Sequence, residues 1–270
     1  MDDSILEHPP CIPDSLPMSF STMKPKQPAK SGSVTTALNR FRCEALFPLV
    51  KRGAGAIAVS RFGGRPALRP RETWPICRDC RSKMPLFIQI DLTKVDHPDS
   101  TPDALRRGLF QLFYCTDENC EPDDCGAFAS NMLARIVPAK FLFEMIAGTG
   151  GPRFTAKQIV GWNARADLPN AEEAMELGIR LSGSKLDEFY IKKAERGSSI
   201  PLDGDKLYGW PGWVQGMFYP ECPKCKKKMI YLYQMDSEDH IPFMFGDSGV
   251  GHVCVCPDHP ERASFYWSCC

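Results

Sequence analysis

Short apolar and aromatic runs, each bounded by turn-forming residues, recur in two parts of the chain. Residues 84–92 (MPLFIQIDL) and 229–236 (MIYLYQMD) are followed by partner runs at 108–115 (GLFQLFYC) and 249–256 (GVGHVCVC). Runs of this length and composition predict β-strands. All but the last of them are apolar on both faces, which predicts strands that are buried on two sides. The pattern therefore predicts a mainly β fold with some α-helix.

Helical signals lie between these two parts of the chain. Residues 170–178 (NAEEAMELG) begin with a capping Asn, continue with glutamates and end at a Gly, which predicts a short helix. Residues 131–146 are ambiguous, because Pro138 argues against one continuous helix. At the N-terminus, residues 1–40 carry many prolines among Ser and Lys residues, and we expect a flexible tail there.

An internal repeat relates the two strand-rich parts. A shift of 145 residues gives nine identical pairs over the 28 positions from 64 to 91. These pairs are Gly64/Gly209, Pro66/Pro211, Pro75/Pro220, Cys77/Cys222, Cys80/Cys225, Lys83/Lys228, Met84/Met229, Gln89/Gln234 and Asp91/Asp236. A shift of 141 then aligns Gly108/Gly249, Cys115/Cys256 and Asp117/Asp258. We infer a pseudo-duplicated β-sheet unit.

The repeat sets the expected domain organisation. We expect one domain over residues 41–270, in which copy one covers about 55–130 and copy two about 201–270. A helical or irregular connector at about 131–200 separates the copies. A chain of 270 residues is long enough for one large domain of this kind.

Charge and hydropathy narrow the partners and the compartment. Lys+Arg and Asp+Glu are both 33, so the chain has no formal net charge, and this disfavours nucleic acid or an anionic membrane as a partner. No run approaches the roughly 18 apolar residues of a membrane-spanning helix. The acidic, proline-broken start is unlike a secretory signal, so we expect a cytoplasmic protein. Disulfides are rare in that compartment.

The cysteines point to metal because most of the 13 occur in closely spaced pairs. In copy two, Cys222 and Cys225 form a C-x-x-C pair, and Cys256 and His259 have the same spacing. Structural zinc takes four tetrahedral thiolate or imidazole ligands, commonly from two such turns. The intervening residues can form a hairpin that brings the second turn back to the first. These four residues are predicted to bind one zinc ion, and whether Cys254 replaces one of them stays open.

Copy one carries a related set. Cys77 and Cys80 precede a predicted strand, while Cys115 and Cys120 follow its partner, and Cys125 competes with Cys120 for the last position. A redox role for the first pair would require a helix after it, whereas the following run is strand-like. We therefore predict two structural zinc ions for the chain. The final pair, Cys269 and Cys270, can be ligands, acylation sites or a frayed end, and we favour the last.

Several motifs in one order resemble the YwqG-like family, an uncharacterised bacterial group. They include 62–75 (FGGRPALRPRETWP), 207–215 (LYGWPGWVQ) and 245–256 (FGDSGVGHVCVC), and the resemblance spans about residues 55–268. It implies a mainly β fold with a few helices, built from a pseudo-duplicated sheet. It brings no established catalytic residues. Many members lack the paired cysteines, so the zinc prediction depends on spacing alone. Some members have been proposed as immunity proteins against toxins.

Three functions remain open. The first is a zinc-stabilised binding module that contacts a protein partner of unknown identity, with toxin immunity as one form of such contact. The second is a metal-dependent hydrolase using Asp91, Asp236 or Asp247, although such residues ordinarily cap turns. The third is nucleic-acid binding through the basic run at 224–228, which the neutral net charge disfavours.

Overall fold

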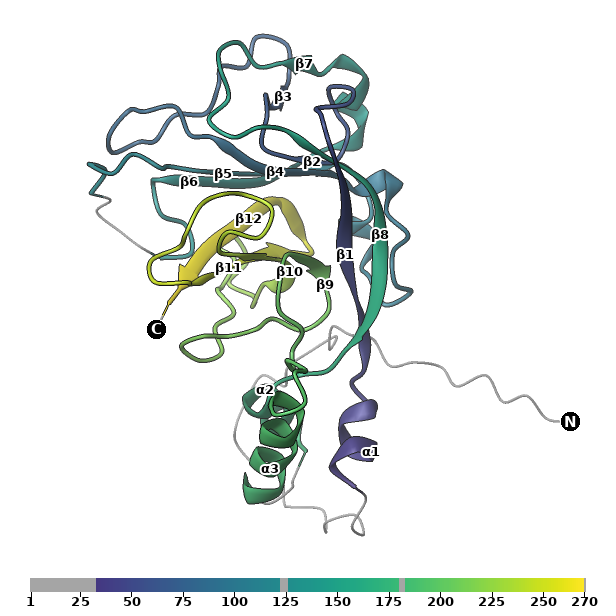
Figure 1. The fold of residues 1–270 in the computed structure, drawn as a ribbon. Coiled ribbons are helices and arrows are strands. Elements are labelled where there is room, and N and C mark those ends of the chain that lie inside the picture. Colours follow the sequence, from purple (N-terminus) through teal and green to yellow (C-terminus); the bar gives the residue numbers. More distant parts are fainter. Residues whose placement is uncertain (1–32, 122–125, 180–182, 270) are drawn as a thin grey trace, which may run out of the picture.

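The computed structural model describes residues 33–121, 126–179 and 183–269. Its strands form a closed barrel in the order β1-β8-β2-β4-β5-β6-β12-β11-β10-β9, and β3 and β7 form a separate small sheet. Neighbouring strands of the barrel run antiparallel. The prediction of a mainly β fold with some helix is therefore confirmed (Figure 1).

The elements have the following bounds. The strands are β1 (Cys43–Arg52), β2 (Arg61–Phe62), β3 (Ala67–Leu68), β4 (Leu86–Asp91), β5 (Leu109–Tyr114), β6 (Met132–Val137), β7 (Ile146–Ala147), β8 (Lys157–Asp167), β9 (Lys206–Tyr208), β10 (Ile230–Asp236), β11 (Val250–Cys256) and β12 (His259–Ser268). The helices are α1 (Val34–Asn39), α2 (Ala171–Glu176) and α3 (Gly183–Ala194), with 3₁₀ turns at Leu92–Lys94, Asp103–Leu105 and Ala139–Glu144.

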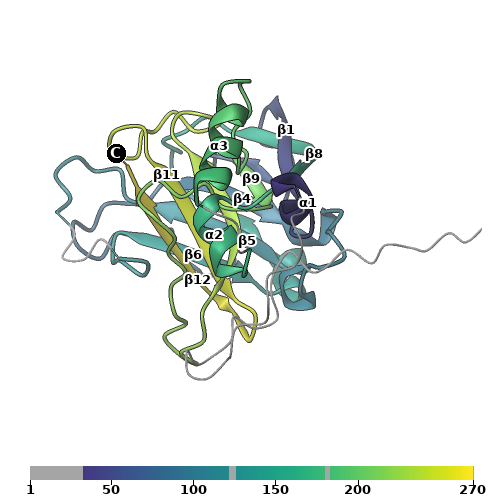
Figure 2. The same ribbon diagram turned by 90° about the horizontal axis from the view of Figure 1, so that it is seen from below.

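The three α-helices gather at one end of the molecule. Figures 1 and 2 show them where the long strand β1 begins and its partner β8 ends. Helix α2 starts as predicted, because the Asn170 side chain accepts a hydrogen bond from the Glu173 amide at 2.8 Å. Within the described part of the chain, no helix combines the length and the apolar character needed to cross a membrane.

The two copies of the repeat correspond to two halves of the barrel, the first with β2, β4 and β5 and the second with β9, β10 and β11. Equivalent side chains make equivalent contacts in these two halves. Gln89 on β4 accepts a hydrogen bond from the Ala67 amide at 3.1 Å and donates one to the Val59 carbonyl at 2.8 Å. Gln234 on β10 repeats both contacts with the residues that lie 145 positions after those partners. Strand β2 lies between β8 and β4, and β9 likewise lies between β1 and β10. The barrel therefore consists of two halves with matching local frames.

An aromatic core fills the barrel between the halves. Phe87 on β4 makes edge-on contacts with Tyr114, Phe154 and Phe243, at ring-centroid distances of 5.8, 5.2 and 5.3 Å. Phe243 comes from the loop between β10 and β11, so this loop of the second half packs on the first. Edge-to-face aromatic pairs contribute about 0.5–1.5 kcal/mol each beyond the burial of their surface.

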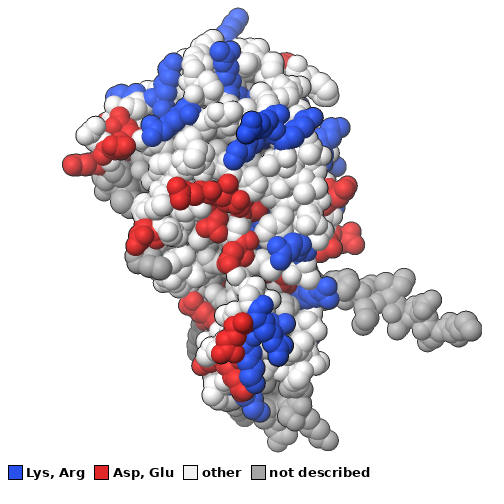
Figure 3. Space-filling view, viewed as in Figure 1, with Lys and Arg blue, Asp and Glu red and all other residues white. Residues whose placement is uncertain are grey.

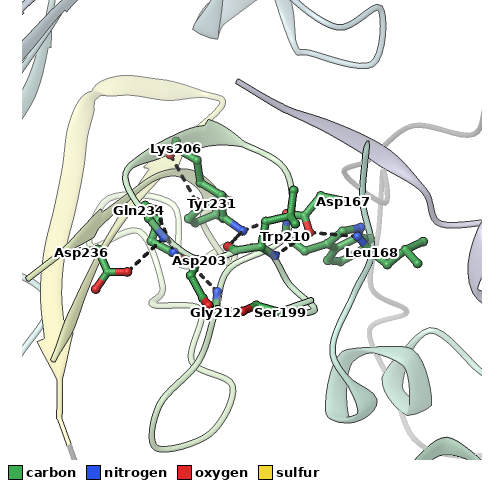
Figure 4. Close-up of polar contacts among 12 residues, drawn as sticks. Asp167, Leu168, Ser199, Asp203, Lys206, Trp210, Gly212, Tyr231, Gln234 and Asp236 are labelled. Carbon is green, nitrogen blue, oxygen red and sulfur yellow. Dashed lines mark hydrogen bonds and ion pairs between the residues drawn. The ribbon is translucent and has the colours of Figure 1, made fainter. Parts of the chain in front are cut away.

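A buried ion pair joins β8 to β9 (Figure 4). Asp167 and Lys206 are 1% and 0% exposed, and the Lys206 Nζ lies 2.8 Å from the Asp167 carboxylate. The same carboxylate accepts hydrogen bonds from the amides of Leu202 and Trp210, both at 2.9 Å. A Cβ on Gly209, whose φ is +78°, would lie 2.6 Å from the carboxylate, so this turn requires glycine. Asp167 thus fixes the path of the chain on both sides of β9.

Two sequence expectations differ from the structure. The connector expected at 131–200 contains the barrel strands β6 and β8. Strand β8 escaped prediction because most of its side chains are at least partly exposed and show no apolar alternation. Residues 34–39, inside the expected tail, form α1, because Ser33 caps the helix and Leu38 is buried. Residues 1–32 of that tail lie outside the described residues.

Replacing Asp167 by Asn should destabilise the fold strongly. The change leaves the Lys206 ammonium buried without its counter-charge, and breaking one partner of such a pair costs about 3–5 kcal/mol. Urea unfolding of both proteins measures the loss. Glu188→Gln, which breaks the exposed ion pair with Lys192 on α3, is the matched control and should leave stability unchanged. Equal unfolding midpoints for the two variants would show that Asp167 has no such role.

Candidate metal centres

The first centre lies at one end of the β4–β5 hairpin. Cys77 and Cys80 precede β4, and Cys115 and Cys120 follow β5. The Sγ atoms of Cys77 and Cys120 are 3.6 Å apart, and those of Cys80 and Cys115 are 3.5 Å apart. The four sulfur atoms all lie within 4.8 Å of one another. The structure therefore brings together the set predicted for copy one.

The second centre occupies the equivalent end of the β10–β11 hairpin. The His259 Nδ1 lies 3.7 Å from the Cys222 Sγ and 3.6 Å from the Cys256 Sγ. The Sγ atoms of Cys225 and Cys256 are 3.6 Å apart. These four donor atoms also lie within 4.8 Å of one another. The predicted set of copy two is thus assembled without Cys254, which is fully buried in the adjacent core.

The C-x-x-C turn, here called the knuckle, has the same backbone in both halves. In the first, the Cys77 amide donates to the Ser82 carbonyl at 2.8 Å, and the Arg81 amide donates to the Cys77 carbonyl at 3.2 Å. The residues 145 positions later repeat both bonds, each at 2.8 Å. Arg81 and its equivalent Lys226 both have positive φ, at 65° and 62°. The turn holds its two sulfur atoms in a fixed relation.

A polar bridge ties each knuckle to the second ligand pair of its centre. In the first half, the Ser82 hydroxyl donates a hydrogen bond to the Asp117 carboxylate at 2.6 Å. In the second half, the Lys227 ammonium lies 2.7 Å from the Asp258 carboxylate. Both bridges join equivalent positions of the repeat. Each bridge links the two ends of its hairpin without using the sulfur atoms, although the Lys227–Asp258 pair is exposed and stabilises little.

The donor sets fit a tetrahedral metal ion. The shortest sulfur separation in the two centres is 3.5 Å, whereas a disulfide needs about 2.05 Å, so these contacts are not disulfides. The residues of both sets are free cysteines, apart from the single imidazole. Soft thiolate donors with one nitrogen are typical of ligands that hold zinc or similar ions. Both clusters can therefore hold a metal.

The thiol pKa values diverge within each centre. Hydrogen bonding with Ser82 lowers the pKa of Cys80 to about 7, whereas burial raises the pKa of Cys115 to about 11. Burial also opposes ionisation of Cys222, but hydrogen bonds from the backbone amides of Cys225 and Lys224 outweigh it and lower the Cys222 pKa to about 6. Burial raises the pKa of Cys256 to about 12. The protein alone favours only part of each set as thiolates, and a bound cation would supply the missing charge.

Comparison with known proteins places the chain in a family. The family model described as "Domain of unknown function (DUF1963)" matches residues 60–268, which include both centres. The chain belongs to this family. A stretch of 67 residues is 33% identical to the "Uncharacterized protein YpfL" of Salmonella typhimurium. That stretch covers 25% of this chain and 16% of YpfL, so the match spans about a sixth of the length of the curated relative.

Two of the three carboxylates considered for catalysis in this DUF1963 chain, Asp91 and Asp236, have structural partners. Asp91 caps the following 3₁₀ turn by accepting a hydrogen bond from the Thr93 amide at 3.0 Å. Asp236 accepts one from the Gly204 amide at 3.0 Å. Neither belongs to the metal-binding groups of the described residues, and the same holds for Asp247.

The remaining cysteines considered as metal ligands are Cys125, Cys269 and Cys270. Cys125 and Cys270 lie outside the described residues. Cys269 is part-buried beside Gly246 and belongs to neither centre.

The sequence did not predict a further cluster of polar side chains, formed by Asp205, Asp239 and His240. The His240 Nδ1 lies 2.8 Å from the Asp205 carboxylate and 3.3 Å from that of Asp239. Burial opposes protonation of His240, but these two partners outweigh it and raise its pKa to about 9. The carboxylates also accept backbone amides, and the imidazole stacks on Phe62 of the other half at 4.5 Å. The cluster therefore fastens the β10–β11 loop to the first half, and no sequence motif connects its members.

A buried carboxyl group stands beside the second centre. Glu173 on α2 is 2% exposed, and its Oε1 accepts hydrogen bonds from the Trp213 indole at 3.1 Å and from the Tyr219 hydroxyl. Its Oε2 has no hydrogen-bond partner in the described structure. Burial raises the pKa of Glu173 to about 7. The fold therefore favours the protonated acid, and ionisation at higher pH carries a cost.

Glu173→Gln should stabilise the protein at alkaline pH. The folded pKa lies above the ordinary value of 4.5, so stability falls as pH rises from about 4.5 to 7, and the full penalty persists above that range. A neutral amide avoids this penalty, with a gain of up to about 3 kcal/mol at pH 8 and little change near pH 4. Thermal unfolding of the parent and the variant at both pH values measures the difference in stability. A variant no more stable than the parent at pH 8 would contradict the assignment; exposed Glu176→Gln is the control.

Proposed function

We propose that the protein is a zinc-stabilised binding module that acts by contact with another protein. The observation that carries this proposal is the pair of complete four-donor sets at equivalent ends of two hairpins. A metal held by four protein ligands has no open position for water or substrate, and such sites stabilise a fold. Their contribution in zinc-finger peptides is about 10–16 kcal/mol.

Zinc is the ion that suits these donors best. A tetrahedral site with Zn–S bonds of about 2.3 Å separates its sulfur atoms by about 3.8 Å. The sulfur contacts of 3.5 and 3.6 Å lie near that spacing. Magnesium and calcium prefer oxygen donors, and both sets lack carboxylates. We assign Cys77, Cys80, Cys115 and Cys120 to one ion, and Cys222, Cys225, Cys256 and His259 to the other.

A protein partner fits the surface better than nucleic acid. Figure 3 shows Lys and Arg gathered at the upper end, with Asp and Glu in a band below and both signs mixed over the lower end. Nucleic-acid-binding proteins carry an extended basic face, whereas the basic residues on this face adjoin an acidic band and the net charge of the chain is zero. The resemblance to YwqG-like proteins supports a bacterial protein, with toxin immunity as one form of contact, and an origin of the two halves by duplication. We also propose a cytoplasmic location, as expected from the sequence.

A metal-dependent hydrolase is the less favoured alternative. It would require a centre with three protein ligands and a nearby free carboxylate. Asp91 and Asp236 each accept backbone amides instead.

Elemental analysis of the purified protein should give about two zinc ions per chain. Cys256→Ser should retain about one, because it removes a ligand from the second centre. Cys254→Ser is the matched control, since this buried cysteine is two residues away and outside the donor set, and it should retain both ions. A stably folded protein without metal would refute the proposal. Equal loss of zinc in both variants would refute the assignment of Cys256.

A further inference from the structure

An open groove of about 550 Å³ lies beside the first centre. Its volume falls within the range of about 300–1000 Å³ typical of ligand sites. Its apolar walls come from Trp74, Pro85 and Pro152, and two cations, Lys83 and Arg153, also line it. The metal centre requires none of these five side chains.

The two cations are available to a ligand. Lys83 and Arg153 are exposed, and within the described part of the chain neither forms a hydrogen bond or ion pair through its side chain. The Lys83 Nζ instead lies 5.9 Å from the centre of the Trp74 ring. Asp117, in the same lining, accepts hydrogen bonds from the Ser82 hydroxyl and the Asn119 amide, and its carboxylate also attracts Arg153 electrostatically. The groove therefore places two exposed cations, the carboxylates of Asp117 and Glu118, and the small accessible part of Trp74 (8% exposed) in one lining.

The equivalent position in the second half is occupied by contacts within the chain. Tyr219 stands where the first half has Trp74, and its hydroxyl donates a hydrogen bond to Glu173 of α2. Lys228 is the equivalent of Lys83. The halves share a metal centre but differ beside it, so the groove is not a by-product of the repeated frame.

We propose that this groove binds a peptide segment of a partner protein through an acidic side chain. Arg153 and Lys83 can bind a carboxylate by charge-assisted hydrogen bonds, and an apolar neighbour on the peptide can pack on the exposed Pro152 and the accessible part of Trp74. Asp117 and Glu118 in the same lining can accept hydrogen bonds from peptide N–H groups, which a chain of phosphates lacks. The inference rests on the proposed function, because it locates the protein contact on one surface.

Fluorescence polarisation of the full-length, zinc-loaded protein tests this assignment. The probes are short labelled peptides with one central Asp or Glu between apolar residues, and the same peptides with Asn or Gln in its place. The acidic peptides should bind, and the amide versions should bind at least about tenfold more weakly. Lys83→Ala and Arg153→Ala should each weaken binding by about tenfold. The matched control, Lys228→Ala, should bind like the parent.

Three results with the peptides would overturn the groove assignment: no binding of any acidic peptide, equal binding of acidic and amide peptides, or unchanged binding in Lys83→Ala and Arg153→Ala. A fourth would be displacement of the peptides by a single-stranded oligonucleotide whose own binding is weakened in the same two variants. Measuring the metal content of the same samples distinguishes a failure of the groove assignment from a failure of the proposed zinc-stabilised module. A protein that keeps both ions but fails these tests refutes the groove alone. A folded protein without metal refutes the proposed function as well.

Discussion

Four donor atoms packed around one point are the constraint on which each half of the barrel depends. In both centres the donors lie within 4.8 Å of one another. Two like charges about 4 Å apart repel by roughly 4 kcal/mol at the effective dielectric constant of a protein near its surface. The sulfur atoms therefore cannot all be thiolates unless a cation balances them. The knuckle backbone and the Ser82–Asp117 bridge bring the donors of the first centre together, and a bound cation would make that arrangement favourable.

The barrel carries two such centres because it repeats one frame, but each half fills that frame with different polar chemistry. In the second half, Lys206 pairs with Asp167 across the β8–β9 region. Arg61, its equivalent on β2, is 2% exposed and donates hydrogen bonds to backbone carbonyls, including that of Ala56 at 2.8 Å. Burial lowers the pKa of Arg61 to about 10. Equivalent buried cations, Lys206 and Arg61, are therefore neutralised by an ion pair in one half and solvated by backbone carbonyls in the other.

The sequence predicts those features whose signals are local. The strands around Gln89 and Gln234 follow from short apolar runs, and the ligand sets follow from the spacing of paired cysteines. Strand β8 gives no such signal, since most of its side chains are at least partly exposed, and in β1 the proline at position 48 obscures an apolar run. The contacts of Glu173 and His240 join residues far apart in the chain, so their burial and their raised pKa values emerge only from the fold.

X-ray absorption spectroscopy at the zinc edge tests the central claim most directly, because it reports which atoms surround the metal. One centre offers four sulfur donors and the other three sulfur donors and one imidazole nitrogen. The account predicts an average shell of about three to four sulfur atoms at about 2.3 Å, with a minor nitrogen contribution at about 2.0 Å. A shell dominated by oxygen or nitrogen, or a shell that includes water, would contradict two closed structural centres.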